Sequence, residues 1–154
     1  MKVAVIGGAG RMGAWFVGYF SSRGFQTALS DVRVEEARSV ASAVGAELAE
    51  TNIGAVRDAD LALVCVPIVE TPGVIREVAP HMRGGAVLAE VSSVKGQTVE
   101  ALRGAASLGV RPLSFHPMFG PAAESLKGKT IVVYRSWTEM SKRASPCPCL
   151  RRLR

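Results

Sequence analysis

Three glycines near the start of the chain constrain its fold more than any other feature of the sequence. Gly8, Gly10 and Gly13 form the pattern G-x-G-x-x-G, and the apolar run from Val3 to Ile6 before them predicts a strand buried on both faces. Apolar residues recur after them at helical spacing, at Met12, Trp15, Phe16, Tyr19 and Phe20. The order of strand, glycine turn and helix favours a dinucleotide site over a glycine-rich turn in some other strand–helix unit.

Each glycine has a predicted role at this site. Gly8 permits the tight turn, the missing Cβ of Gly10 lets the backbone approach a pyrophosphate, and Gly13 lets the helix pack closely on the strand. The helix N-terminus offers free N–H groups and a partial positive charge to the phosphates. The predicted cofactor contacts in this stretch are therefore Gly8, Ala9, Gly10, Arg11, Met12 and Gly13.

Asp31 is the residue predicted to distinguish NAD from NADP. It follows a second apolar run, Phe25 to Leu29, at the place where a carboxylate accepts a hydrogen bond from a ribose 2′-OH. The same carboxylate repels a 2′-phosphate, so the sequence predicts NAD as cofactor and disfavours NADP. Arg33, two residues later, weakens this preference because its side chain can swing toward a phosphate.

The rest of the chain alternates short apolar runs with helical patterns. Further strands are expected at 46–49, 61–66, 86–91, 110–115 and 130–134, and helices at 34–44, 69–79 and 94–102. This alternation predicts an α/β fold with a doubly wound, mostly parallel sheet of the Rossmann type. Pro112 is expected to break the sixth strand, and residues 116–121 are expected to form a turn-rich loop.

Ligands of such sheets bind beyond the carboxyl ends of the strands, so the residues that follow each strand are the candidate site. Val66 and Pro67 follow the fourth strand and join the predicted cofactor contacts. His116 follows the sixth strand, and a histidine there can accept a proton from a substrate hydroxyl near neutral pH. The alternative is a turn histidine that bonds only to the backbone.

Ser93 and Lys95 follow the fifth strand at the start of a predicted helix. Ser93 is interpreted as a helix N-cap, although a capping hydroxyl can also face a ligand. Lys95 gains nothing from the helix dipole at an N-terminus, which favours an anionic partner. His81, after Pro80 at a helix end, is interpreted as structural.

Four motifs, in this order and spacing, resemble the prephenate/arogenate dehydrogenase family of tyrosine biosynthesis. They are Gly-Gly-Ala-Gly-Arg-Met-Gly at 7–13, Val-Pro-Ile at 66–68, Ser-Val-Lys-Gly at 93–96 and His-Pro-Met-Phe-Gly-Pro at 116–121. The resemblance implies NAD- or NADP-dependent oxidative decarboxylation of prephenate to 4-hydroxyphenylpyruvate. It makes His116 the catalytic histidine that bonds the ring hydroxyl, Ser93 a residue that orients this hydroxyl, and Lys95 a lysine near the substrate.

The resemblance covers residues 1–134, which are the expected dinucleotide-binding domain. Family members continue into a helical domain that forms the dimer and supplies an arginine for the substrate carboxylates. We expect this chain to be truncated before that domain, to form no family dimer and to turn over prephenate or arogenate poorly. The alternatives are an NAD(P)-binding module without catalysis and a reductase of the pyrroline-carboxylate or β-hydroxyacid type, against which the loop at 116–121 argues.

The net charge of +6 is concentrated in residues 135–154, a basic stretch with no apolar period. We expect this stretch to be a disordered tail, and the nearly neutral remainder argues against nucleic acid as a partner. No apolar run approaches the roughly 20 residues of a membrane span, so no membrane association and a cytoplasmic location are expected.

The cysteines predict neither a disulfide framework nor a metal site. Cys65 lies in an apolar run and is interpreted as a buried thiol. Cys147 and Cys149 are spaced C-x-C, whereas structural zinc sites use C-x-x-C pairs with two further ligands.

Overall fold

The computed structural model describes residues 1–134, which form a single seven-stranded sheet with the order β3-β2-β1-β4-β5-β6-β7. Each neighbouring pair is parallel except β6 and β7, which are antiparallel. The strands are β1 (Lys2–Ile6), β2 (Gln26–Ser30), β3 (Glu47–Leu48), β4 (Leu61–Val64), β5 (Val87–Glu90), β6 (Arg111–Pro117) and β7 (Ile131–Tyr134). The predicted doubly wound, mostly parallel sheet is confirmed.

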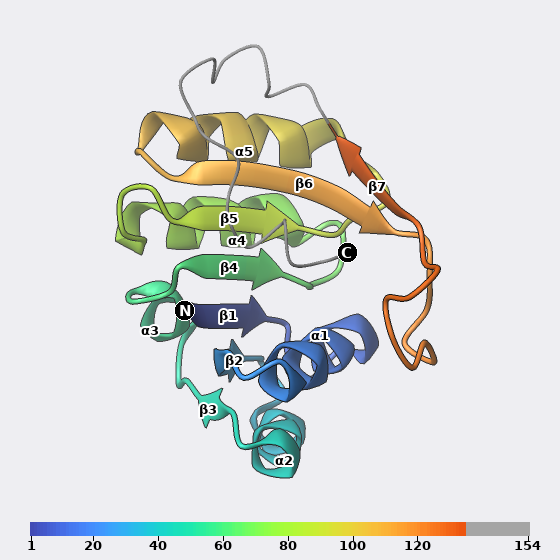
Figure 1. Cartoon of the computed structure of the whole chain (residues 1–154). Coiled ribbons are helices and arrows are strands. Elements are labelled where there is room, and N and C mark those ends of the chain that lie inside the picture. The colour runs from blue at the N-terminus through green and yellow to red at the C-terminus, as the bar shows by residue number, and fades with distance from the viewer. Residues whose placement is uncertain (135–154) are drawn as a thin grey trace.

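Helices cover both faces of this sheet (Figure 1). They are α1 (Arg11–Ser22), α2 (Val34–Val44), α3 (Asn52–Val56), α4 (Thr71–Val78) and α5 (Gly96–Ser107), with a 3₁₀ turn at Ala79–His81. The alternation of side chains along β1 divides the core: Val3 and Val5 pack toward α1 and α2, whereas Ala4 and Ile6 pack toward α3, α4 and α5. None of the helices in the described part of the chain is long and apolar enough to span a membrane.

The order of the strands reverses between β1 and β4, because β2 and β3 extend the sheet on one side and β4, β5 and β6 extend it on the other. Such a reversal opens a crevice at the carboxyl edge of a parallel sheet. The loop after β1 and the start of α1 lie at that point, so the fold places the glycine motif where a ligand binds.

Close contacts explain the glycines of this loop. A Cβ on Gly13 would lie 2.0 Å from the Gly7 carbonyl oxygen, and one on Gly8 would lie 2.6 Å from Cβ of Leu29. The positive φ of the turn, 79°, belongs to Gly7. The left-handed residue of the turn is thus Gly7, whereas Gly8 permits the turn to pass close to Leu29 of β2.

β6 differs from the prediction, because it continues through Pro112 and includes His116 and Pro117. The N–H of Arg111 donates to the carbonyl of Ala86, the residue before β5, so the nitrogen of Pro112 faces the opposite side of β6. β7 pairs only with residues 114–117, and Pro112 therefore removes no hydrogen bond between described strands. As a result His116 lies on a strand, which fixes its backbone more firmly than the expected loop.

The substitution Gly13→Ala tests the packing of α1 on β1. The added Cβ collides with backbone that cannot move aside, so we expect the free energy of unfolding to fall by about 1–3 kcal/mol. Gly18→Ala in the same helix is the matched control: no atom lies within 4 Å of the added Cβ, and a gain of about 0.5–1 kcal/mol is expected. Urea denaturation measures both, and equal stabilities would contradict the packing argument.

Candidate active site

The start of α1 presents an open backbone at the carboxyl edge of the sheet. Gly10 is the N-cap residue, and no side chain caps the helix there. A Cβ on Gly10 would lie 3.1 Å from the Gly7 carbonyl oxygen, so a side chain at this position would crowd the loop. The first-turn N–H groups, those of Arg11, Met12 and Gly13, have no acceptor within a helix. These features fit the pyrophosphate of a dinucleotide.

Asp31 is bound to the glycine loop. Its Oδ2 accepts from the N–H of Ala9 at 2.9 Å, and its Oδ1 accepts from the backbone N–H of Arg33 at 3.0 Å and from Arg33 Nε at 3.3 Å. Burial acts to raise the pKa of Asp31, but the hydrogen bonds from Arg33 and Ala9 outweigh it, and the pKa is lowered. Asp31 is thus a carboxylate at neutral pH, with the guanidinium of Arg33 beside it.

The segment after β4 lies against the same loop. A Cβ on Gly7 would be 2.7 Å from the carbonyl oxygen of Cys65 and 3.0 Å from a methyl group of Val66. Pro67 is exposed, and its carbonyl accepts from the hydroxyl of Thr71 at 3.1 Å at the start of α4. Val66 and Pro67 therefore follow the strand next to β1, in line with their predicted place at the cofactor.

The Cys65 thiol is half-buried at this position. Burial raises its pKa, and the negative charge of Glu90 raises it further. The thiol thus stays protonated and is a poor nucleophile. Within residues 1–134 no group of His, Cys, Asp and Glu has the composition of a metal site, and Cys147 and Cys149 lie outside the described residues.

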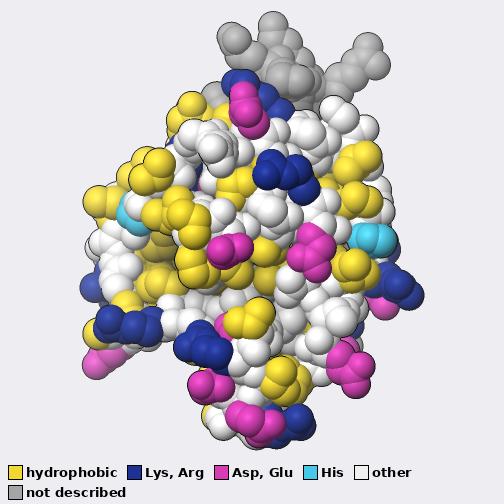
Figure 2. Space-filling view, turned by 180° about the vertical axis from the view of Figure 1, so that it is seen from behind, with side chains coloured by type: hydrophobic (Ala, Val, Ile, Leu, Met, Phe, Trp, Pro, Cys, Tyr) yellow, Lys and Arg dark blue, Asp and Glu magenta, His cyan; other side chains and the backbone are white. Residues whose placement is uncertain are grey.

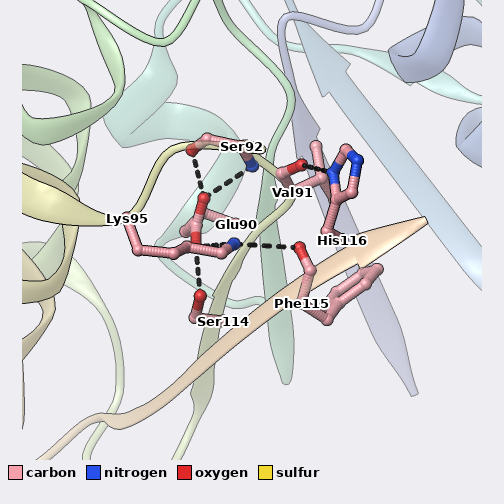
Figure 3. Close-up of polar contacts among 7 residues, drawn as sticks. All are labelled: Glu90, Val91, Ser92, Lys95, Ser114, Phe115 and His116. Carbon is pink, nitrogen blue, oxygen red and sulfur yellow. Dashed lines mark hydrogen bonds and ion pairs between the residues drawn. The ribbon is translucent and has the colours of Figure 1, made fainter. Parts of the chain in front are cut away.

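His116 projects from β6 beside the loop that follows β5 (Figure 3). Its Nδ1 lies 3.2 Å from the carbonyl oxygen of Val91. A carbonyl only accepts hydrogen bonds, so in the neutral ring Nδ1 carries the proton and Nε2 keeps its lone pair. The ring therefore bonds to the backbone, and that bond leaves Nε2 with a lone pair; proton transfer from a substrate hydroxyl stays a prediction.

Lys95 has an anionic partner within the chain. Its Nζ lies 2.8 Å from Oε1 of Glu90 and 3.3 Å from the carbonyl oxygen of Phe115, and 18% of its side chain is exposed. Lys95 is also the N-cap residue of α5, which begins at Gly96. The interpretation of Ser93 as the helix cap was therefore wrong, and its exposed side chain lies in the loop between β5 and α5.

Sequence reasoning missed Glu90, which is fully buried at the end of β5. Its carboxylate accepts from the N–H and hydroxyl of Ser92, the ammonium of Lys95 and the hydroxyl of Ser114 (Figure 3). The signal was present in the sequence, because an acid inside the apolar run 86–91 must find partners when buried. Those partners are the residues around the predicted site.

The structure brings the predicted residues to one edge of the sheet. Strands β4 and β5 lie between β1 and β6 in the sheet. The glycine loop after β1 is therefore three strand spacings, roughly 14 Å, from His116 on β6. The histidine side chains, coloured cyan, appear near the left and right margins of the face shown in Figure 2. His81 precedes β5 at the amino edge of the sheet, so it is remote from this site.

The sequence profile described as "Prephenate dehydrogenase, nucleotide-binding domain" matches residues 18–135. The chain belongs to this family. The predicted membership of the prephenate/arogenate dehydrogenase family is thereby confirmed for the nucleotide-binding domain. A probable arogenate/prephenate dehydrogenase of Methanocaldococcus jannaschii is 34% identical over 133 residues. That match covers 86% of this chain and 30% of the archaeal protein, so the chain spans about a third of that relative's length.

Solved structures agree on the fold. Synechocystis arogenate dehydrogenase superposes with a TM-score of 0.69 at 24% identity, covering 80% of this chain and 43% of that protein. An imine reductase from Myxococcus stipitatus in complex with NADP+ superposes with a TM-score of 0.70 at 27% identity, covering 79% of this chain and 42% of that protein. These likenesses show that the chain shares the fold of these domains.

Proposed function

We propose that residues 1–134 are the dinucleotide-binding domain of a prephenate dehydrogenase, which converts prephenate to 4-hydroxyphenylpyruvate in tyrosine biosynthesis. The observation that carries the proposal is the hydrogen bond from Nδ1 of His116 to Val91, which leaves Nε2 as a proton acceptor at the carboxyl edge of the sheet. Family membership supplies the reaction class, and the related arogenate is the alternative substrate.

His116 acts in this proposal as a general base and then as a general acid. Nε2 takes the proton of the ring hydroxyl, so the carbon that bears the hydroxyl becomes a carbonyl as its hydride leaves. The substrate carboxylate then departs as CO₂, its electron pair enters the ring, and the former carbonyl oxygen recovers the proton from Nε2 as a phenol. NAD(P)+ supplies the hydride acceptor when bound. Proton transfer of this kind contributes roughly 10²–10⁴-fold to a rate.

Ser93 and Lys95 complete the proposed catalytic set. The exposed hydroxyl of Ser93 is available to orient the substrate hydroxyl. The family resemblance implies that Lys95 is a lysine near the substrate. The ammonium of Lys95 is already paired with Glu90, so its charge is largely compensated. The two carboxylates of prephenate therefore require further cationic donors for tight binding.

We propose the glycine loop, Asp31, Val66 and Pro67 as the cofactor contacts, with NAD+ preferred over NADP+. The preference rests on Asp31, whose charge disfavours a 2′-phosphate. Calorimetric titration of the chain should show tighter binding of NAD+, and Arg33→Ala should widen the difference because it removes the cation beside Asp31. Arg38→Ala, which removes an exposed arginine paired with Glu35, is the matched control and should change neither affinity. Equal or tighter binding of NADP+ by the unmodified chain would contradict the preference.

The substitution His116→Asn tests the proposed reaction. NAD+ affinity should stay nearly unchanged, because the pyrophosphate contacts lie three strands away. In any form of the protein that oxidises prephenate, formation of NADH should fall by roughly 10²–10⁴-fold. His81→Asn at the opposite edge is the matched control and should alter neither quantity.

The outcomes separate the proposal from its alternatives. Loss of NAD+ affinity in His116→Asn would make this histidine structural. Binding of NAD+ by the unmodified chain without oxidation of prephenate or arogenate would favour a dinucleotide-binding module without catalysis.

A further inference from the structure

A fully buried carboxylate lies beneath the proposed catalytic residues. Glu90 ends β5, whose other residues are apolar, and none of its surface is exposed. Burying a carboxylate among apolar side chains is unfavourable unless the group is paired and hydrogen-bonded. Figure 3 shows Glu90 between its donors, which reach it from the loop after β5 and from β6.

Both oxygens of Glu90 are fully used by these donors. Oε2 accepts from the N–H of Ser92 at 2.7 Å and from the hydroxyl of the same residue. Oε1 accepts from the ammonium of Lys95 at 2.8 Å and from the hydroxyl of Ser114 at 2.5 Å. A carboxylate has about four acceptor sites, so Glu90 has none left for a substrate. Glu90 therefore cannot be the base of the reaction itself.

The contact with Ser114 fixes the strand that carries His116. Ser114 is the register partner of Glu90 in the β5–β6 pair, and the hydrogen bond between their side chains holds this register. His116 lies two residues further along β6, so it projects from the same face as Ser114. The ammonium of Lys95 adds a second link to β6 through the carbonyl of Phe115.

The contact with Ser92 fixes the other partner of the imidazole. Ser92 follows Val91 directly, and its N–H and hydroxyl both bind Glu90. The carbonyl of Val91, which accepts the hydrogen bond from Nδ1 of His116, is thereby held in position. Glu90 thus links two neighbours of the imidazole. Through Ser114 it holds the strand that carries His116, and through Ser92 it holds the Val91 carbonyl that sets the tautomer of His116.

We propose that Glu90 is a positioning residue of the active site, which holds the Val91 carbonyl and His116 together and so keeps Nε2 free to accept a proton. It acts through Ser92, Ser114 and Lys95 and does not touch the substrate. This role rests on the proposed function of His116.

Nuclear magnetic resonance of the chain labelled with ¹⁵N-histidine tests this proposal without substrate or cofactor. Above the pH at which the imidazoles are protonated, the ¹⁵N shifts of His116 should show a protonated Nδ1 and an unprotonated Nε2. In Glu90→Gln an amide donor replaces one carboxylate oxygen and faces either the donors of Ser92 or those of Lys95 and Ser114, so the two ring shifts should move toward each other as the tautomers mix. Glu77→Gln, which alters an exposed acceptor of Asn52, is the matched control and should leave the ring shifts unchanged.

His81 reports whether each variant is folded, because it lies far from the substitution at the other edge of the sheet. If Glu90→Gln fails to fold, Ser114→Ala decides the question, since it removes only one of the four donors. It should move the His116 shifts in the same direction by a smaller amount. Unchanged His116 shifts in folded Glu90→Gln, or in Ser114→Ala where Glu90→Gln does not fold, would overturn the proposal.

The result is separable from the proposed function. Mixed tautomers in the Glu90 and Ser114 variants, together with a His116→Asn chain that oxidises prephenate as fast as the unmodified chain, would support the positioning role and overturn the reaction. Oxidation of prephenate by a chain whose variants keep the single tautomer would support the reaction and overturn the positioning role.

Discussion

The contact between Gly13 and the carbonyl of Gly7 is the constraint on which the rest of the structure depends. No side chain fits between them, so the first turn of α1 lies directly against the turn that ends β1. This contact aims the free N–H groups of the helix at the crevice where the strand order reverses. Asp31 joins the same unit through the hydrogen bond that it accepts from Ala9, so the proposed cofactor contacts of β1, β2 and α1 are linked directly to one another.

A second, polar unit lies further along the same edge. Glu90 unites the ends of β5 and β6 by hydrogen bonds and an ion pair, whereas the glycine loop is held by backbone packing. The two kinds of contact suit two different tasks. A loop that receives phosphates must keep its N–H groups open, while a proton acceptor such as His116 needs partners that fix one tautomer.

Apolar periodicity and glycines were sufficient to predict the sheet, the order of its elements and the edge at which the site lies. The local sequence pattern did not predict the extent of β6. The strand tolerates Pro112 because the proline nitrogen lies on its unpaired side, and pairing with β7 extends the strand to His116. The prediction that Ser93 caps the helix was wrong because Glu90 binds Ser92 and Lys95, so that α5 begins only at Gly96. Glu90 itself was missed because its partners meet only through tertiary pairing, which no local pattern encodes. The predictions for residues 135–154 lie outside the described part of the chain.

The central claim is that one dinucleotide reaches from the glycine loop to His116. Titration of the ¹⁵N-labelled chain with NAD+ and, separately, with ADP-ribose, which lacks the nicotinamide, tests it most directly. We predict that both ligands move the amide resonances of residues 7–13 and Asp31, that only NAD+ moves the ring resonances of His116, and that neither moves those of His81. Equal effects of the two ligands on His116, or an unchanged glycine loop, would contradict the account.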